Sequence, residues 1–100
     1  MIINELYATI LSRKTADPAT SYTARLFAAG EDEIVKKVGE EAIEVILAAK
    51  GQGNARLLEE TADLTYHVLV LLAARGLSPA DVEAVLAKRK KAVPHNLLKG

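Results

Sequence analysis

The chain has no cysteine and no tryptophan, and its 100 residues include only three prolines, three tyrosines and one phenylalanine. The lack of cysteine excludes disulfides, thiolate metal sites and a cysteine nucleophile, and it fits a cytoplasmic protein. Thirteen basic and 13 acidic side chains give a formal net charge of zero. The chain therefore has no overall field that would attract nucleic acid or an anionic membrane, and any anion binding must come from a local cluster.

Long hydrophobic runs are also missing. The longest apolar run, Val68 to Ala74, is far shorter than the roughly 20 residues that a membrane-spanning helix needs. The N-terminal stretch MIINELYATILSRK has neither a basic segment before an apolar core nor a small-residue cleavage site, so we expect no signal peptide. These features predict a soluble, cytoplasmic protein.

The length predicts a single domain over residues 1–100, with residues 93–100 as a tail of uncertain order. Half of the residues are apolar, which is generous for a chain whose own core is small. Because surplus apolar surface is often buried between subunits, we expect a homo-oligomer, most simply a homodimer.

Apolar residues recur with helical spacing throughout, and no stretch alternates polar and apolar residues over the length of a strand. The expected helices run from Ile2 to about Lys14, Ser21 to Ala29, Glu31 to about Lys50, Asn54 to Arg75, and Ser78 to about Lys91. Gly51-Gln52-Gly53 is the expected turn between the long helices, with Asn54 as the N-cap that follows it. We predict an all-α fold, a helical bundle with two long antiparallel central helices, completed as a dimer.

The helix expected over residues 31–50 carries three carboxylates within the stretch GEEAIE, beside an otherwise apolar stripe. That stripe comprises Ile34, Val38, Ala42, Val45 and Ala49. At about 100° per residue, Glu41 and Glu44 fall along one edge of it, with Lys37 between them in angle. Glu40 points further round the helix.

The next long helix repeats this design. Its expected core stripe comprises Leu57, Leu64, Val68, Leu71 and Leu72. Glu60, Asp63 and His67 line one flank of that stripe. Because the intervening turn is short, the two helices should pack antiparallel and bring Glu41, Glu44, Glu60 and Asp63 into one cluster.

Such a cluster needs positive charge. Two carboxylates 4 Å apart repel by about 1 kcal/mol in water and by several times more where the dielectric falls. Lys37 alone is too little, and a site with only oxygen ligands suits Mg²⁺, with Mn²⁺ as a substitute. The alternative is a solvated acidic face with i,i+4 lysine pairs. Two adjacent helices with the same acidic spacing favour the metal site.

These residues also resemble a known signature. Glu40-Glu41-x-x-Glu44, then 15 residues, then Glu60-x-x-Asp63 is similar to the motif of the all-α, MazG-like nucleoside-triphosphate pyrophosphatases. The segments SYTARLFAAG, KKVGEEAIEVILAAK and EETADLTYHVLVLLAARGLS, in this order, resemble the phosphoribosyl-ATP pyrophosphatases of histidine biosynthesis. The resemblance extends over about residues 6–90.

The resemblance implies an all-α dimer that hydrolyses the α–β phosphoanhydride of phosphoribosyl-ATP, giving phosphoribosyl-AMP and pyrophosphate. It implies phosphoribosyl-AMP cyclohydrolase as a functional neighbour. Because nothing follows residue 100, we expect the stand-alone form of the enzyme. Carried over, the motif makes Glu41, Glu44, Glu60 and Asp63 the catalytic Mg²⁺ ligands, and Glu40 a candidate water-orienting base.

Other residues are candidates for binding the substrate, each with a structural alternative. Lys37 lies one turn before Glu41 and either reaches the phosphates or forms an ion pair with the acids. Ser21, Tyr22 and Thr23 stand at a helix start, where they suit phosphate binding or simple N-capping. The remaining candidates are His67, as a packed residue, a partner of Asp63 or a substrate contact, and Arg25 and Arg89, as phosphate ligands or surface charges.

Two other functions stay open at this stage. The first is a housekeeping pyrophosphatase for dUTP, dCTP or damaged nucleotides, whose acid cluster would be identical. The second is a helical dimerisation module without catalytic activity.

Overall fold

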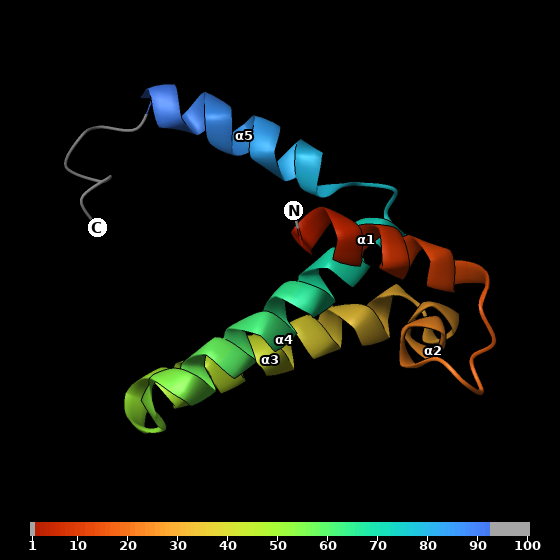
Figure 1. Ribbon diagram of the computed structural model, residues 1–100, viewed down its shortest axis with the longest axis horizontal. Coiled ribbons are helices and arrows are strands. Elements are labelled where there is room, and N and C mark those ends of the chain that lie inside the picture. The colour runs from red at the N-terminus through yellow and green to blue at the C-terminus, as the bar shows by residue number, and fades with distance from the viewer. Residues whose placement is uncertain (1, 93–100) are drawn as a thin grey trace.

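The computed structural model describes residues 2–92, and all regular structure in that range is helical (Figure 1). Its elements are α1 (Ile2–Ser12), the 3₁₀ turn η1 (Arg13–Thr15), α2 (Tyr22–Ala29), α3 (Glu31–Gly51), α4 (Gly53–Ala74) and α5 (Pro79–Ala92). Helices α3 and α4 form a long antiparallel hairpin, α1 and α2 pack at its open end, and α5 extends away from the body (Figure 1). The predicted all-α fold is confirmed, whereas the predicted tail at residues 93–100 lies outside the described residues.

The helix ends follow local signals in the sequence. Ser21 caps α2, because its Oγ accepts a hydrogen bond from the backbone N–H of Ala24 at 3.1 Å. At the start of α5, the backbone N–H of Ser78 donates to the Asp81 carboxylate at 2.9 Å. The backbone N–H of Asp81 donates back to Ser78 Oγ at 3.4 Å, which completes a capping box. Helix α4 ends at Ala74, and Gly76 follows two residues later with a φ of 70°, which suits glycine.

Three predicted boundaries were wrong. The first helix ends at Ser12 rather than near Lys14, because the chain tightens into the turn η1 before the turn at residues 17–20. Asn54 is not an N-cap, since α4 begins at Gly53 and only Gln52 separates the long helices. Gly53 has a φ of 87°, which lets the chain reverse in so short a turn. Helix α4 also ends one residue earlier than predicted, at Ala74.

The hydrophobic core lies at the open end of the hairpin. Its buried members are Ile10, Leu26, Ile34, Leu69, Val70 and Ala73, which come from α1, α2, α3 and α4. At the same end, Arg75 binds Glu31 through two hydrogen bonds of 2.7 and 3.1 Å. This guanidinium lowers the pKa of Glu31, and the pair links the start of α3 to the end of α4.

The predicted core stripes were partly wrong. On α3, Ala48 is buried where Ala49 was expected. On α4, Leu64 and Val68 are only half-buried, whereas Glu60 and His67 are buried. The C-terminal half of α4 is apolar on nearly every side, so periodicity alone did not select the face that packs inward.

The other apolar side of α4 lines an open groove beside α1 and α5, with a volume of about 360 Å³. The lining residues are Ile3, Leu64, Thr65, Val68, Leu69, Leu72, Pro79, Val82 and Glu83. Beyond Pro79, α5 is exposed from Ala80 to Lys90. Among the described residues, no helix combines the length and apolarity that a membrane crossing requires.

Candidate active site

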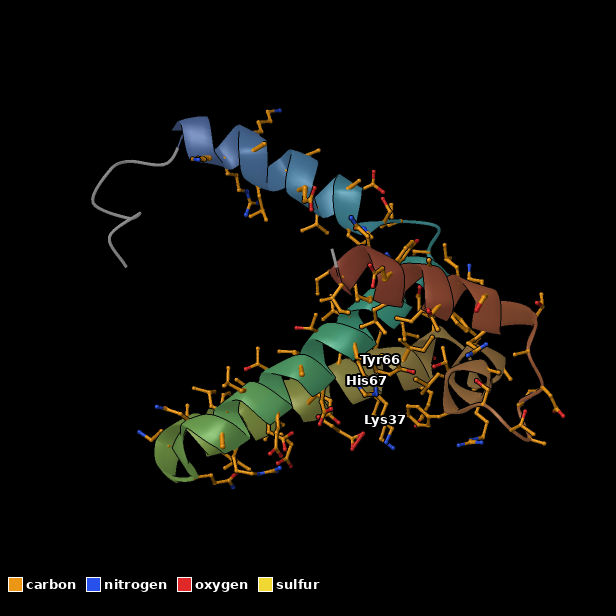
Figure 2. All side chains as sticks on the ribbon, viewed as in Figure 1. Lys37, Tyr66 and His67 are labelled. Carbon is orange, nitrogen blue, oxygen red and sulfur yellow. The ribbon has the colours of Figure 1, made fainter. Side chains whose placement is uncertain are left out.

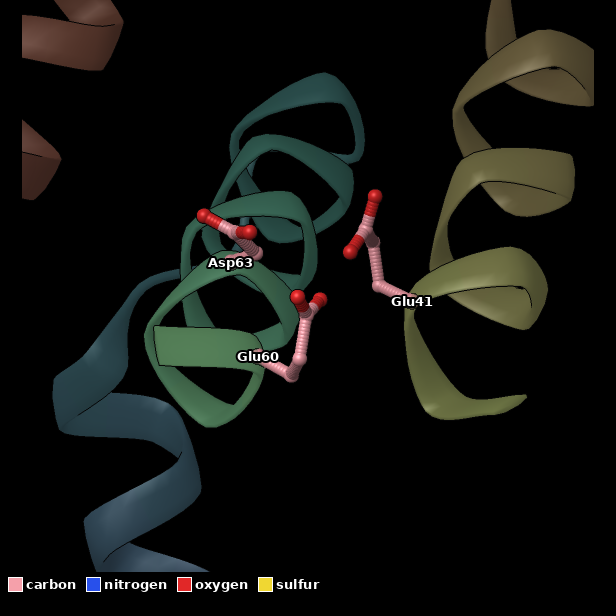
Figure 3. A group of neighbouring side chains, drawn as sticks. All are labelled: Glu41, Glu60 and Asp63. Atoms are coloured by element: carbon pink, nitrogen blue, oxygen red, sulfur yellow. The ribbon is translucent and has the colours of Figure 1, made fainter. Parts of the chain in front are cut away.

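Three carboxylates meet across the long hairpin. Glu41 of α3 and Glu60 and Asp63 of α4 each contribute one carboxylate oxygen to a group in which all oxygens lie within 4.8 Å of one another. Figure 3 shows Glu41 reaching from α3 toward the two acids of α4. Glu60 is only 6% exposed, Glu41 is half-buried and Asp63 is exposed. We call these three residues the acid cluster.

The hairpin geometry explains this convergence. Glu41 lies 11 residues before Gln52, the single residue of the turn, and Asp63 lies 11 residues after it. At equal distances from the turn, antiparallel helices with the same rise per residue place the two side chains at the same height. Glu60, three residues before Asp63, shares its face of α4.

Arg56 supplies positive charge that the sequence analysis missed. Its guanidinium forms an ion pair with Glu60 and another with Glu59, and these partners raise the pKa of Arg56. The i,i+4 spacing of Arg56 and Glu60 is the sequence signal that would have found this pair. Lys37, the cation that the sequence did suggest, is half-buried and extends outward from α3 (Figure 2).

The acid cluster fits a hard divalent cation. All of its ligand atoms are carboxylate oxygens, which Mg²⁺ and Mn²⁺ prefer. Ligands at about 2.1 Å from Mg²⁺ lie up to about 4.2 Å apart when they are on opposite sides of the ion. The spread of 4.8 Å therefore needs only small side-chain adjustments to reach that geometry.

The structure does not bring every predicted acid into this group. Glu44 is half-buried on α3 and is not a member of the acid cluster. Glu40 is exposed on α3 and is not a member either. Of the four predicted metal ligands, three therefore converge in the described chain.

The predicted phosphate-binding segment is engaged within the protein. Tyr22 Oη lies 3.0 Å from His67 Nε2, and Thr23 Oγ1 is hydrogen-bonded to the hydroxyl of Tyr66. Ser21 Oγ caps α2. Arg25 donates to the backbone carbonyl of Pro18 at 3.1 Å and lies over the Tyr22 ring. Arg89 is exposed on α5.

His67 connects this segment to the acid cluster. Its Nδ1 lies 2.7 Å from the backbone carbonyl oxygen of Asp63, and its side chain is buried. The ring packs edge-on against Tyr66, with ring centres 4.9 Å apart, and against Tyr22 at 6.0 Å. Burial is the main cause of the raised pKa of Tyr22, and the negative charge of Glu41 adds to it. Tyr22 and His67 thus lie beside the acid cluster.

Comparison with known proteins assigns the chain to a family. Residues 3–90 match the family described as phosphoribosyl-ATP pyrophosphohydrolase. The chain belongs to this phosphoribosyl-ATP pyrophosphohydrolase family. The matched residues reach into all five helices and include the acid cluster and the residues around His67.

Curated relatives in this family are close in sequence. A phosphoribosyl-ATP pyrophosphatase of Pelotomaculum thermopropionicum is 58% identical over 90 residues, which cover 90% of this chain and 92% of the relative. The enzyme of the same name from Trichlorobacter lovleyi is 61% identical over 80 residues, covering 80% of this chain and 73% of the relative. The histidine biosynthesis bifunctional protein HisIE of Deinococcus radiodurans is 52% identical over 88 residues, which cover 88% of this chain and 40% of that protein.

Proposed function

We propose that this member of the phosphoribosyl-ATP pyrophosphohydrolase family hydrolyses phosphoribosyl-ATP to phosphoribosyl-AMP and pyrophosphate in histidine biosynthesis. We further propose that Mg²⁺, held by Glu41, Glu60 and Asp63, is required. The activity is supported by the names of two relatives that are 58% and 61% identical. The observation that carries the metal site is the convergence of three carboxylate oxygens from two helices within 4.8 Å.

The proposed reaction is a hydrolysis at phosphorus. A water oxygen forms a bond to the α-phosphorus and releases a proton to solvent, the bond from that phosphorus to the bridging oxygen breaks, and pyrophosphate leaves. A bound divalent ion supplies charge neutralisation for the phosphate oxygens and lowers the pKa of a coordinated water. Glu41, Glu60 and Asp63 would hold that ion, and Glu44, half-buried one turn after Glu41, would offer a fourth carboxylate.

Two cations near the acids complete the proposed site. Arg56 already pairs with Glu60, and we propose that a divalent ion takes over part of that neutralising role. Lys37 lies one turn before Glu41 and extends outward, which suits a phosphate ligand (Figure 2). Glu40 holds no ion in the proposed site, because it is not a member of the acid cluster.

The reaction is tested by measuring pyrophosphate release from phosphoribosyl-ATP, dUTP, dCTP and ATP in parallel. With Mg²⁺ present, we expect kcat/KM for phosphoribosyl-ATP to exceed that for each other nucleotide by at least about 10²-fold, because an enzyme discriminates through contacts to the whole substrate. EDTA should abolish the activity and excess Mg²⁺ should restore it. Equal turnover of dUTP or dCTP would favour the housekeeping pyrophosphatase, and activity that survives EDTA would contradict the metal site.

We also propose that the chain works as a homodimer. We propose the apolar groove beside α4 and the exposed face of α5 as its interface. Val82, Val85 and Leu86 of α5 support this, because they are 42%, 51% and 58% exposed. A second copy that lies in the groove would cover this surface, and burial of apolar area favours association. The cytoplasmic location and the phosphoribosyl-AMP cyclohydrolase neighbour stay predictions, although one relative, HisIE, is named as bifunctional.

Changing Val68 to aspartate tests the dimer. Val68 lines the groove, so a charge there should weaken association by at least about 10²-fold, since an unpaired buried charge costs several kcal/mol. Light scattering after size exclusion measures the mass, and circular dichroism checks that the helices persist. Asn54→Asp is the matched control, because Asn54 is exposed at the hairpin tip. A wild-type chain that is monomeric at high micromolar concentration would contradict the dimer.

A further inference from the structure

Two hydroxyl groups at the start of α2 form hydrogen bonds with side chains of α4. Tyr22 is bonded to His67 and Thr23 to Tyr66, so two successive residues of α2 engage two successive residues of α4. We call these two contacts the α2–α4 clasp. The Tyr22 and Tyr66 rings also stack, with an interplanar angle of 28° and centres 6.3 Å apart. These contacts fix the start of α2 on the segment of α4 that directly follows Asp63.

The proton positions in the clasp follow from its acceptors. The backbone carbonyl oxygen of Asp63 only accepts hydrogen bonds, so His67 Nδ1 at 2.7 Å must carry the hydrogen. In the neutral imidazole, Nε2 is then an acceptor, and the hydroxyl of Tyr22 donates to it. Hydrogen bonds therefore run from Tyr22 to His67 and from His67 to Asp63. The Tyr22 hydroxyl is thus engaged by a side chain of the protein itself.

The clasp bears directly on a residue of the acid cluster. His67 is only 6% exposed, so its ring cannot leave the Asp63 carbonyl without breaking buried contacts. Asp63 itself is exposed, and none of the described hydrogen bonds holds its carboxylate. Among the described side-chain contacts, the one nearest to that carboxylate along the chain is the contact of His67 with the Asp63 backbone carbonyl.

We propose that Tyr22 and His67 are positioning residues for the acid cluster rather than phosphate ligands. They hold the Asp63 turn of α4 so that its carboxylate meets those of Glu41 and Glu60. Groups that orient ligands from outside the first coordination layer change metal affinity by about 10–100-fold when they are removed. The inference rests on the proposed metal site. It gives the Ser21-Tyr22-Thr23 segment a positioning role instead of the predicted phosphate binding.

The test measures Mn²⁺ binding to the substrate-free protein, by the loss of the free-ion signal in electron paramagnetic resonance. His67→Ala should weaken binding by about 10–100-fold, and Tyr22→Phe by about 10-fold, because phenylalanine keeps the ring and removes only the donor. His67→Asn keeps a donor near the Nδ1 position, so it should bind Mn²⁺ more tightly than His67→Ala. Its affinity for Mn²⁺ should lie within about 3-fold of that of Tyr22→Phe. Tyr7→Phe is the control, since its hydroxyl binds the Leu77 carbonyl away from the acid cluster.

The outcomes separate the positioning role from general stability and from the proposed function. Thermal unfolding of each variant, followed by circular dichroism, identifies any variant that fails to fold, and Thr23→Val provides a second probe of the clasp. Wild-type protein that binds Mn²⁺, with clasp variants that bind it equally well, would overturn the inference and leave the proposed function standing. Wild-type protein that binds no Mn²⁺ would overturn the metal site and the inference together.

Discussion

Replacing Glu41 with glutamine should reduce the turnover of phosphoribosyl-ATP by about 10²–10³-fold and leave the helices intact. The amide keeps the shape of the side chain and removes its charge, which costs about 3–4 kcal/mol of stabilisation if the ion is lost or displaced. Glu41 is the only contribution of α3 to the acid cluster, so only Glu60 and Asp63 of that cluster would then remain to hold the ion. The measurement is kcat/KM at saturating Mg²⁺.

The stability of this variant should be unchanged or slightly raised. Three carboxylate oxygens within 4.8 Å repel one another in the metal-free protein, and the substitution removes one charge from that group. Glu59→Gln is the matched control, because Glu59 is an exposed acid beside Glu60 and is not a member of the acid cluster. Full turnover by Glu41→Gln would contradict the proposed site. A large loss of turnover in Glu59→Gln would show that the general charge near the site matters more than the geometry of the metal ligands.

Replacing Ile34 with alanine should lower the free energy of unfolding by about 2–5 kcal/mol. Ile34 is 1% exposed and packs in the cluster that joins α1, α2, α3 and α4, so its truncation leaves a cavity at the point where four helices meet. A domain is typically stable by only about 5–15 kcal/mol, so the loss is a large fraction of the total. Denaturant unfolding, measured at several protein concentrations, separates this effect from subunit dissociation.

Ile2→Ala is the control for that cavity. Ile2 is 73% exposed, so its change should alter the free energy of unfolding by no more than about 0.5 kcal/mol. If Ile34→Ala and Ile2→Ala lowered the free energy of unfolding equally, the core at the open end of the hairpin would not be the main source of stability.

The features that the sequence predicted well are local. Ser21 as a cap, the Ser78–Asp81 capping box and the break at Gly76 depend on residues within a few positions of one another. The convergence of Glu41 with Asp63 was also predictable, because it needs only two helical periods and a short turn between them. The helix caps and the convergence of Glu41 with Asp63 both follow from regular helix geometry and from residues close together in the sequence.

The features that the sequence did not predict depend on how distant elements pack. The contact of Tyr22 with His67 joins residues 45 positions apart, and nothing in either segment alone specifies the partner. The inward face of α4 was misassigned, because Leu64 and Val68 are as apolar as the buried Val70. The pairing of Arg56 with Glu60 was within reach of the i,i+4 rule.

The one-residue turn at Gln52 has a consequence for changes in the length of the chain. Inserting a single residue between Glu41 and the turn would rotate the α3 side of the site by about 100° relative to α4 and shift it by about 1.5 Å. Insertions of seven residues in both arms would restore nearly the same angular and axial relationship, because seven residues make almost two full helical turns. Natural or engineered variants of this hairpin should therefore keep the same number of residues between the turn and the site on α3 and on α4. They should tolerate equal insertions in both helices far better than an insertion in one helix.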